Sequence, residues 1–227
     1  MQIWIASLVL LVSYLFGSIP MGLITVKLAT GKDVRDIQSG RTGGTNAMRA
    51  AGFWIGLLTS FLDMSKGIIA VWLARTFTPD MIWLEILAPT MGILGHNYSI
   101  YLVRKDEEGH LLWRGGAGGA PAVGGVVGYW PLSIFILVPA GALMLFGVGF
   151  ASVATLSLPI ISAIILAIRA YLGLSPWQYL IYCLLAEILI VWSLRPNLVR
   201  LLNGNERVVG WRAKRVNARR EAKNAST

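Results

Sequence analysis

IWIASLVLLVSYLFGSIPMGLITV, residues 3–26, is an apolar run without a charged side chain. A helix needs about 20 such residues to cross about 30 Å of hydrocarbon. The run lacks an early small-residue cleavage site, and further apolar stretches follow it, so it is not a cleavable signal. The stretch therefore predicts a helix that stays in the bilayer.

The composition extends this prediction to the whole chain. Hydrophobic residues make up 56% of the 227 residues, which is more than one soluble core of this size needs. We expect an all-α, polytopic membrane bundle with about seven transmembrane helices, and we place these at residues 3–26, 53–76, 81–95, 118–130, 132–148, 153–172 and 177–192. Residues 1–200 then form one transmembrane domain, and residues 201–227 form a basic tail. The single Cys183 lies in an apolar segment, which argues against a disulfide framework or a Cys/His metal cluster.

The basic residues predict the orientation. Lysines and arginines cluster at residues 27–49, at residues 104–114 and in the tail, and with seven spans these regions share one face. That face is expected to be cytoplasmic, with the N-terminus outside. Basic residues beside a membrane orient the protein and attract anionic lipid headgroups, so we do not expect nucleic acid as a partner.

Between the first two apolar runs lies SGRTGGTNAMR, residues 39–49, which mixes hydroxyls, glycines, an amide and two arginines. Such a mixture is suited to holding an anion. Arg49 stands among small and apolar neighbours, so its charge is expected to have a partner. The candidate residues of this stretch are Ser39, Arg41, Thr45, Asn46 and Arg49.

A second stretch, RGGAGGAPAVGG at residues 114–125, is rich in glycine. Successive glycine amides that lead into a helix can form a phosphate-binding nest, although glycines also allow membrane helices to pack closely. The flanking arginine favours an anion site. The candidates here are Arg114, Gly115, Gly116, Gly118 and Gly119.

A third polar stretch, RPNLVRLLNGNE at residues 195–206, begins where the last span ends. Asn197 and Arg200 are three residues apart and share a helical face, and Gly204 is expected just past the helix C-terminus. All three stretches fall on the predicted cytoplasmic face. We therefore expect them to form one site.

These segments carry a resemblance. YLFGSIP (14–20), DVRDIQSGRTGGTNAMRAAG (33–52), LDMSKG (62–67), GHNY (95–98), the Gly-rich loop and residues 197–206 follow one another in order. In order and spacing the set resembles the bacterial acyl-phosphate:glycerol-3-phosphate acyltransferases, which are seven-span inner-membrane enzymes without an HxxxxD motif. This chain also lacks that motif, because Tyr101 and Gly115 stand five residues after His96 and His110.

The resemblance implies an activity. Such an enzyme moves a fatty acyl group from acyl phosphate to the 1-hydroxyl of glycerol 3-phosphate and releases lysophosphatidic acid and phosphate. Acyl phosphate has a good leaving group, so no covalent intermediate, metal or cofactor is expected. The implied partners are acyl phosphate, glycerol 3-phosphate, membrane lipid and the soluble enzyme that makes acyl phosphate. The implied location is the bacterial inner membrane.

The resemblance also implies roles for single residues. Ser39 and Arg49 fall on the family's first-motif serine and arginine, His96 on its Gly-His position and Asn197 on its C-terminal asparagine. These four are the expected catalytic residues. The expected substrate-binding residues are Arg41, Thr45, Asn46, Arg114, Gly115, Gly116, Gly118, Gly119, Ser152 and Glu206.

Several positions depart from the family pattern. The lysine and threonine of the family's Gly-rich loop are Ala117 and Pro121 here, and its C-terminal histidine is Leu194. The asparagine after the first Ser-Gly is Arg41, and residues 105–113 are an insertion. Arg41, or His110 from the insertion, could compensate for the missing groups.

Two alternatives to an active enzyme remain open. A non-catalytic relative that binds an acyl or phosphate ligand would explain Ala117 and Leu194. A transporter or channel would use Asp63 and Lys66 on one face of the second span, although we interpret this pair as a structural ion pair. The sequence shows no inverted repeat that would support a transporter.

Overall fold

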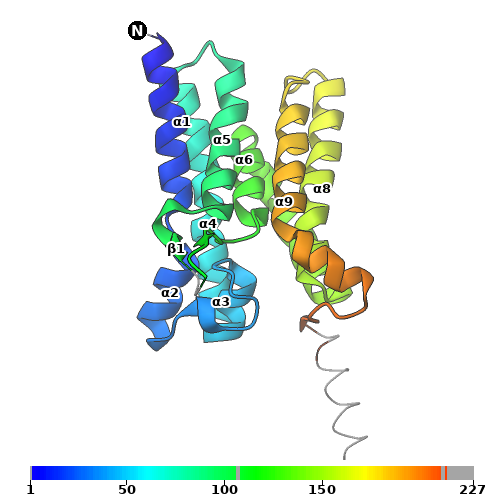
Figure 1. Ribbon diagram of the computed structural model, residues 1–227. Coiled ribbons are helices and arrows are strands. Elements are labelled where there is room, and N and C mark those ends of the chain that lie inside the picture. The colour runs from blue at the N-terminus through cyan, green and yellow to red at the C-terminus, as the bar shows by residue number, and fades with distance from the viewer. Residues whose placement is uncertain (1, 106–107, 211–212, 214–227) are drawn as a thin grey trace, which may run out of the picture.

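The computed structural model describes residues 2–105, 108–210 and 213, and it is almost entirely helical (Figure 1). The elements in chain order are α1 (Gln2–Ser18), α2 (Met21–Thr30), η1 (Val34–Asp36), α3 (Gly44–Ala51), α4 (Phe53–Phe77), α5 (Ile82–Asn97), η2 (Ile100–Leu102), β1 (Arg104–Lys105), β2 (Leu111–Leu112), α6 (Gly119–Tyr129), η3 (Pro131–Ser133), α7 (Ile134–Leu143), η4 (Met144–Val148), α8 (Ala151–Tyr171) and α9 (Tyr179–Leu202). The strands pair as a short antiparallel hairpin.

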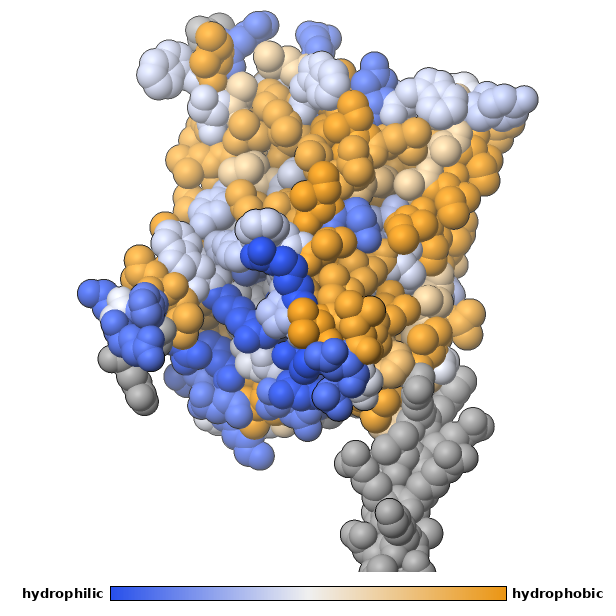
Figure 2. Space-filling model, turned by 45° about the vertical axis from the view of Figure 1, so that its right-hand side comes forward, coloured by the Kyte–Doolittle hydropathy of each residue, from blue (hydrophilic) through white to orange (hydrophobic). Residues whose placement is uncertain are grey.

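Five helical segments of the described chain are long and apolar enough to cross a membrane. They are Gln2–Thr30, Phe53–Phe77, Pro131–Val148, Ala151–Tyr171 and Tyr179–Leu202. Hydrophobic side chains cover much of the surface between two more polar ends in Figure 2. The protein is therefore a multi-pass membrane protein. The count of seven remains a prediction, since its two shortest segments correspond to α5 and α6, with 16 and 11 residues.

The first predicted span is not one continuous helix. Pro20 separates α1 from α2, because proline lacks a backbone N–H and disfavours a helical conformation at the residue before it. Figure 1 shows α2 beside α3 at the end of the molecule opposite the N-terminus. The break thus brings the chain to the segment that contains residues 39–49.

Glycines set the distance between α4 and α6. A Cβ atom on Gly124 of α6 would overlap the carbonyl oxygen of Met64, and one on Gly67 of α4 would overlap the carbonyl oxygen of Pro121. The two backbones therefore touch, as small residues allow in membrane bundles. This contact fixes the Gly-rich loop, which leads into α6, against α4.

We expect Gly124→Ala to lower the melting temperature of the detergent-purified protein, since the added methyl group must push α6 away from α4. Overpacking of this kind costs roughly 1–3 kcal/mol. Gly147→Ala is the matched control, because its Cβ would meet only a Leu143 methyl carbon at 3.8 Å. Equal melting temperatures for both variants would show that the α4–α6 contact is not tight.

The last helix bends, and the chain returns after it. Pro196 lies inside α9, whose final turns run at an angle to its upper part in Figure 1. Asn203 caps the helix and Gly204 has φ +72°, so the expected glycine after the C-terminus is confirmed. The following segment pairs with the start of α8 through a bridge between Phe150 and Val208. Most of the predicted basic tail lies outside the described residues.

Candidate functional site

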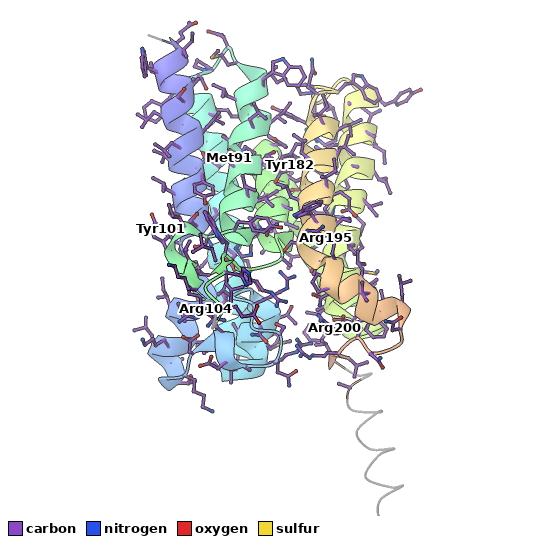
Figure 3. All side chains as sticks on the ribbon, viewed as in Figure 1. Met91, Tyr101, Arg104, Tyr182, Arg195 and Arg200 are labelled. Atoms are coloured by element: carbon purple, nitrogen blue, oxygen red, sulfur yellow. The ribbon has the colours of Figure 1, made fainter. Side chains whose placement is uncertain are left out.

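A cavity of about 290 Å³ is lined by all three polar stretches identified in the sequence. The first stretch contributes Arg41 and Arg49, the Gly-rich loop contributes Gly118 and Gly119, and the third contributes Asn197. Figure 2 shows the surface hollowed among hydrophilic residues at the end where α2 and α3 lie, and Figure 3 places Arg104 and Arg200 at that same end. The predicted meeting of the three stretches is therefore confirmed.

Asn46 organises the first stretch. Its side chain is buried, and Nδ2 donates to the carbonyl oxygens of Val34, Ile37 and Arg41, each at 2.9 Å. Its Oδ1 accepts from the backbone N–H of Ser39 at 3.4 Å. These contacts occupy the amide donors with backbone carbonyls, so Asn46 shapes the loop. It also lines the cavity, and its contact with a phosphate stays a prediction.

Arg49 reaches the cavity from the last turn of α3. Gly44 lets this helix lie directly on α4, since a Cβ there would overlap the Ser60 hydroxyl. Partial burial, and then the nearby Arg207, lower the pKa of Arg49, while Glu206 acts in the opposite direction. Its Nη2 is buried without a hydrogen-bond partner, so a donor of the guanidinium is available to a ligand.

Arg41 also lies in the cavity wall, with its side chain buried. Nη1 donates to the carbonyl oxygen of Gly116 at 2.8 Å and to Ser193 Oγ at 2.9 Å. Nη2 donates to the Ser193 carbonyl oxygen and lies 3.5 Å from Asn197 Oδ1. The side chain thus joins the first stretch to the Gly-rich loop and to α9.

Three of the hydroxyl residues that line the same cavity are ones the sequence predicted. Ser39 and Thr45 are partly exposed, and Ser39 Oγ accepts from the Arg41 backbone N–H at 3.4 Å. Ser152 lies in the first turn of α8, and its Oγ is buried without a hydrogen-bond partner. All three are therefore placed where they can contact a ligand.

A buried ionic cluster borders the cavity. Asp63 Oδ1 lies 2.7 Å from Lys66 Nζ and 3.3 Å from His96 Nδ1. Lys66 Nζ also donates to the Ile19 carbonyl oxygen at 2.6 Å, which ties α4 to the break between α1 and α2. Asp63 and His96 line the cavity, so the cluster holds the His96 ring in its wall.

The third stretch supplies an amide and a carboxylate. Asn197 Nδ2 donates to Glu206 Oε1 at 3.0 Å, and Glu206 Oε2 lies 3.5 Å from Arg200 Nε. Asn197 and Glu206 are buried, and both line the cavity. The segment that follows α9 therefore closes one side of the cavity. Asn197 and Glu206 orient each other there through their hydrogen bond.

Part of the expected Gly-rich site lies elsewhere. Arg114, Gly115 and Gly116 do not line the cavity, and Arg114 is exposed. The backbone N–H groups of Gly115 and Gly116 donate to the carbonyl oxygens of Asn97 and His96, at 3.0 and 2.9 Å. These amides are therefore already paired, and a direct ligand contact from the three residues is not supported. Instead, Gly118, with φ +95°, turns the loop into α6 beside the cavity.

The sequence interpretation missed three contributors to the site. Asp63, which the sequence predicts to be part of a structural ion pair, lines the cavity. Arg207 also lines it and directly follows Glu206, just beyond the predicted third stretch. Ser193, the partner of Arg41, lies in an apolar span and carries no sequence signal of its own.

Comparison with known proteins agrees with these observations. A profile of the family described as glycerol-3-phosphate acyltransferase matches residues 7–204. A protein of that name from Prochlorococcus marinus (strain MIT 9312) is 35% identical, with 88% of this chain and 95% of the relative covered. Another of that name, from Thermus thermophilus, is 37% identical, with 90% and 95% covered.

Two crystal structures share the fold. One is of PlsY (YgiH), an integral membrane glycerol 3-phosphate acyltransferase, in its glycerol 3-phosphate form, with a TM-score of 0.75 and 29% identity over 90% of this chain and 96% of that one. The other is the lysophosphatidic acid form, with a TM-score of 0.74, 28% identity, and 90% and 95% covered. Together with the profile match, these relatives show that the chain belongs to the glycerol-3-phosphate acyltransferase family.

Proposed function

We propose that this protein transfers a fatty acyl group from acyl phosphate to the 1-hydroxyl of glycerol 3-phosphate in the bacterial inner membrane. Family membership supports an acyltransferase acting on glycerol 3-phosphate, and the related PlsY structures are titled as forms with glycerol 3-phosphate and with lysophosphatidic acid. These relatives favour the enzyme over the alternatives of a non-catalytic ligand-binding relative and a transporter.

The observation that carries the proposal is that one cavity combines two kinds of lining. Its polar lining includes Arg41, Arg49 and the start of α6, where unpaired helix amides favour a phosphate. Its apolar lining comes largely from α4 and α7 and includes Leu57, Phe61, Met64, Leu137, Val138, Gly141 and Ala142. A phosphate joined to a fatty acyl chain matches both kinds of lining.

The reaction needs alignment and charge stabilisation more than a covalent intermediate. The hydroxyl oxygen attacks the acyl carbon, the bond from that carbon to the phosphate oxygen breaks, and the hydroxyl proton ends on the departing phosphate. Arg49 and Ser39 hold glycerol 3-phosphate. The start of α6 holds the acyl phosphate. His96 relays the proton, with Asp63 orienting its ring through Nδ1.

The direct test uses purified protein with palmitoyl phosphate and labelled glycerol 3-phosphate, and measures lysophosphatidic acid. We expect product well above that of a heat-killed control. If no product forms at any pH of a series, while the protein remains folded and binds glycerol 3-phosphate, the non-catalytic alternative is correct.

The proposal requires both substrates to reach the site from one side of the membrane. This topology can be tested without an activity assay. We expect reporters fused after Thr227 and inserted after Gly109 to lie in the cytoplasm, because basic residues flank both points. Reporter activity or cysteine labelling in intact cells measures this. A periplasmic signal from either fusion would contradict the orientation and, with it, access for a soluble enzyme that supplies acyl phosphate.

A further inference from the structure

Arg41 is a buried cation without a carboxylate partner. It forms no ion pair among the described residues, and its hydrogen bonds go to the neutral oxygens of Gly116 and Ser193. Its Nε is buried with no partner, and the side chain lines the cavity. A buried charge is costly unless an opposite charge compensates it. The Glu206 carboxylate acts on this charge only from beyond Asn197, which contacts both residues. The geometry therefore favours an anion in the cavity beside Arg41.

Arg41 departs from the family pattern, and its side chain lies beside two other positions that also depart from it, Ala117 and Leu194. Its guanidinium binds the carbonyl oxygen of Gly116, which precedes Ala117, and both backbone and side-chain oxygens of Ser193, which precedes Leu194. Ala117 and Leu194 both line the cavity. The arginine thus lies between the two positions that lack the expected lysine and histidine. His110, by contrast, is exposed on the hairpin, 3.5 Å from Glu108, and does not line the cavity.

A carbonyl oxygen at the bend of α9 holds Arg41 in this position. Pro196 cannot donate its backbone nitrogen to the carbonyl of Trp192, and the helix bends there. Arg195 Nε binds the free Trp192 oxygen, and Arg41 takes the neighbouring oxygen of Ser193. Because two of its nitrogens are held by backbone and hydroxyl oxygens, the guanidinium is preorganised and its remaining donor has a fixed direction.

We propose that Arg41 is a catalytic residue that binds the phosphate of acyl phosphate at the start of α6 and stabilises the charge on it as the acyl carbon–oxygen bond breaks. In this chain it takes the place of a lysine at position 117. The proposal rests on the proposed function, and it separates the two arginines, since Arg49 serves glycerol 3-phosphate. The bond broken, the bond formed and the proton transfer are those given above.

The charge state of Arg41 is suited to this role. Burial, and then the nearby Arg114 and Arg200, lower the pKa of Arg41 to about 10, while Tyr98 and Glu206 act in the opposite direction. The group is therefore a cation at neutral pH. Since the protonated form is the one that binds phosphate, binding through Arg41 should be lost as the pH rises through about 10.

The test compares Arg41→Gln, Ala117→Lys and the double variant, with acyl phosphate varied at saturating glycerol 3-phosphate. Arg41→Gln keeps an amide donor for the backbone oxygens but removes the charge. We expect about a hundredfold loss of kcat/KM for acyl phosphate, with KM for glycerol 3-phosphate within threefold of wild type. The double variant should recover at least tenfold, because a lysine at 117 restores the cation. Ala117→Lys alone should bring no gain, since Arg41 already fills the site.

A binding measurement keeps the test independent of turnover. Inorganic phosphate, added to protein saturated with glycerol 3-phosphate, should raise the melting temperature of wild type and of the double variant but not of Arg41→Gln. If wild type shows this pattern yet makes no lysophosphatidic acid, the phosphate site stands and the proposed function fails. If Arg41→Gln keeps its activity or its phosphate response, or if the lysine rescues neither, Arg41 is only a structural contact and the inference is wrong.

Discussion

Replacing Arg49 by alanine should abolish the thermal stabilisation that glycerol 3-phosphate gives to the wild-type protein in detergent. A ligand that binds only the folded state stabilises it by about 2.7 kcal/mol at a hundred times its Kd. Arg49 lines the cavity and has a buried, unpartnered Nη2, so its main polar contact is expected to be the ligand. The loss of charge-assisted hydrogen bonds worth roughly 1.5–3 kcal/mol each should lower affinity about a hundredfold or more.

Two further variants separate binding from folding. Arg49→Lys keeps the charge but loses the planar fork, so it should retain a small part of the stabilisation. Arg104→Ala removes an exposed arginine of β1 that does not line the cavity, and it should respond to glycerol 3-phosphate as wild type does. The unliganded melting temperature of Arg49→Ala should stay close to that of wild type, since no protein partner of Nη2 is removed.

An equal shift for wild type and Arg49→Ala would show that this arginine does not hold the phosphate. The same conclusion would follow if inorganic sulfate stabilised both proteins as strongly as glycerol 3-phosphate. In either case Ser39 and Thr45, which line the cavity on the same stretch, would be the next residues to test.

The sequence predicted the features that depend on local pattern. Long apolar runs indicate membrane helices whatever their neighbours, and α4 and α8 lie close to their predicted limits. The last helix, α9, continues to Leu202, beyond the predicted end at residue 192. The grouping of the polar stretches followed from counting spans, because loops separated by an even number of crossings share a face. The structure brings these loops to one cavity even though α5 and α6 fall short of a full span.

What the sequence could not give depends on three-dimensional partners. Asn46 looked like a ligand contact, but its amide is used by three backbone carbonyls that only the folded loop brings together. The sequence offers Arg41 and His110 as two candidates to replace the missing groups, and only the contacts of Arg41 with Gly116 and Ser193 distinguish between them. Hydrogen bonds between such distant residues leave no spacing pattern in the chain.

The Asp63–Lys66 pair illustrates the same limit, and it leads to a prediction of comparable size. Sequence spacing placed the two residues on one face of a helix, and the structure shows them in contact at 2.7 Å with both side chains only 1% exposed. It also adds the Ile19 carbonyl oxygen and His96 as partners. The pair therefore connects the break between α1 and α2, the helix α4 and the wall of the cavity.

We expect Lys66→Met to destabilise the protein by roughly 3–5 kcal/mol, because it leaves the Asp63 carboxylate buried with only His96 beside it. Asp63→Asn together with Lys66→Met should recover much of this loss, since the double variant has no buried unpaired charge. Lys27→Met removes an exposed lysine from the last turn of α2 and should change stability by less than about 0.5 kcal/mol. All three variants are compared by thermal unfolding in detergent, monitored by near-ultraviolet circular dichroism.

If the single and double variants melt at the same temperature, the ionic attraction does not set the stability of this region. The bond from Lys66 to the Ile19 carbonyl, which both variants lose, would then be the contact that holds α4 to the break.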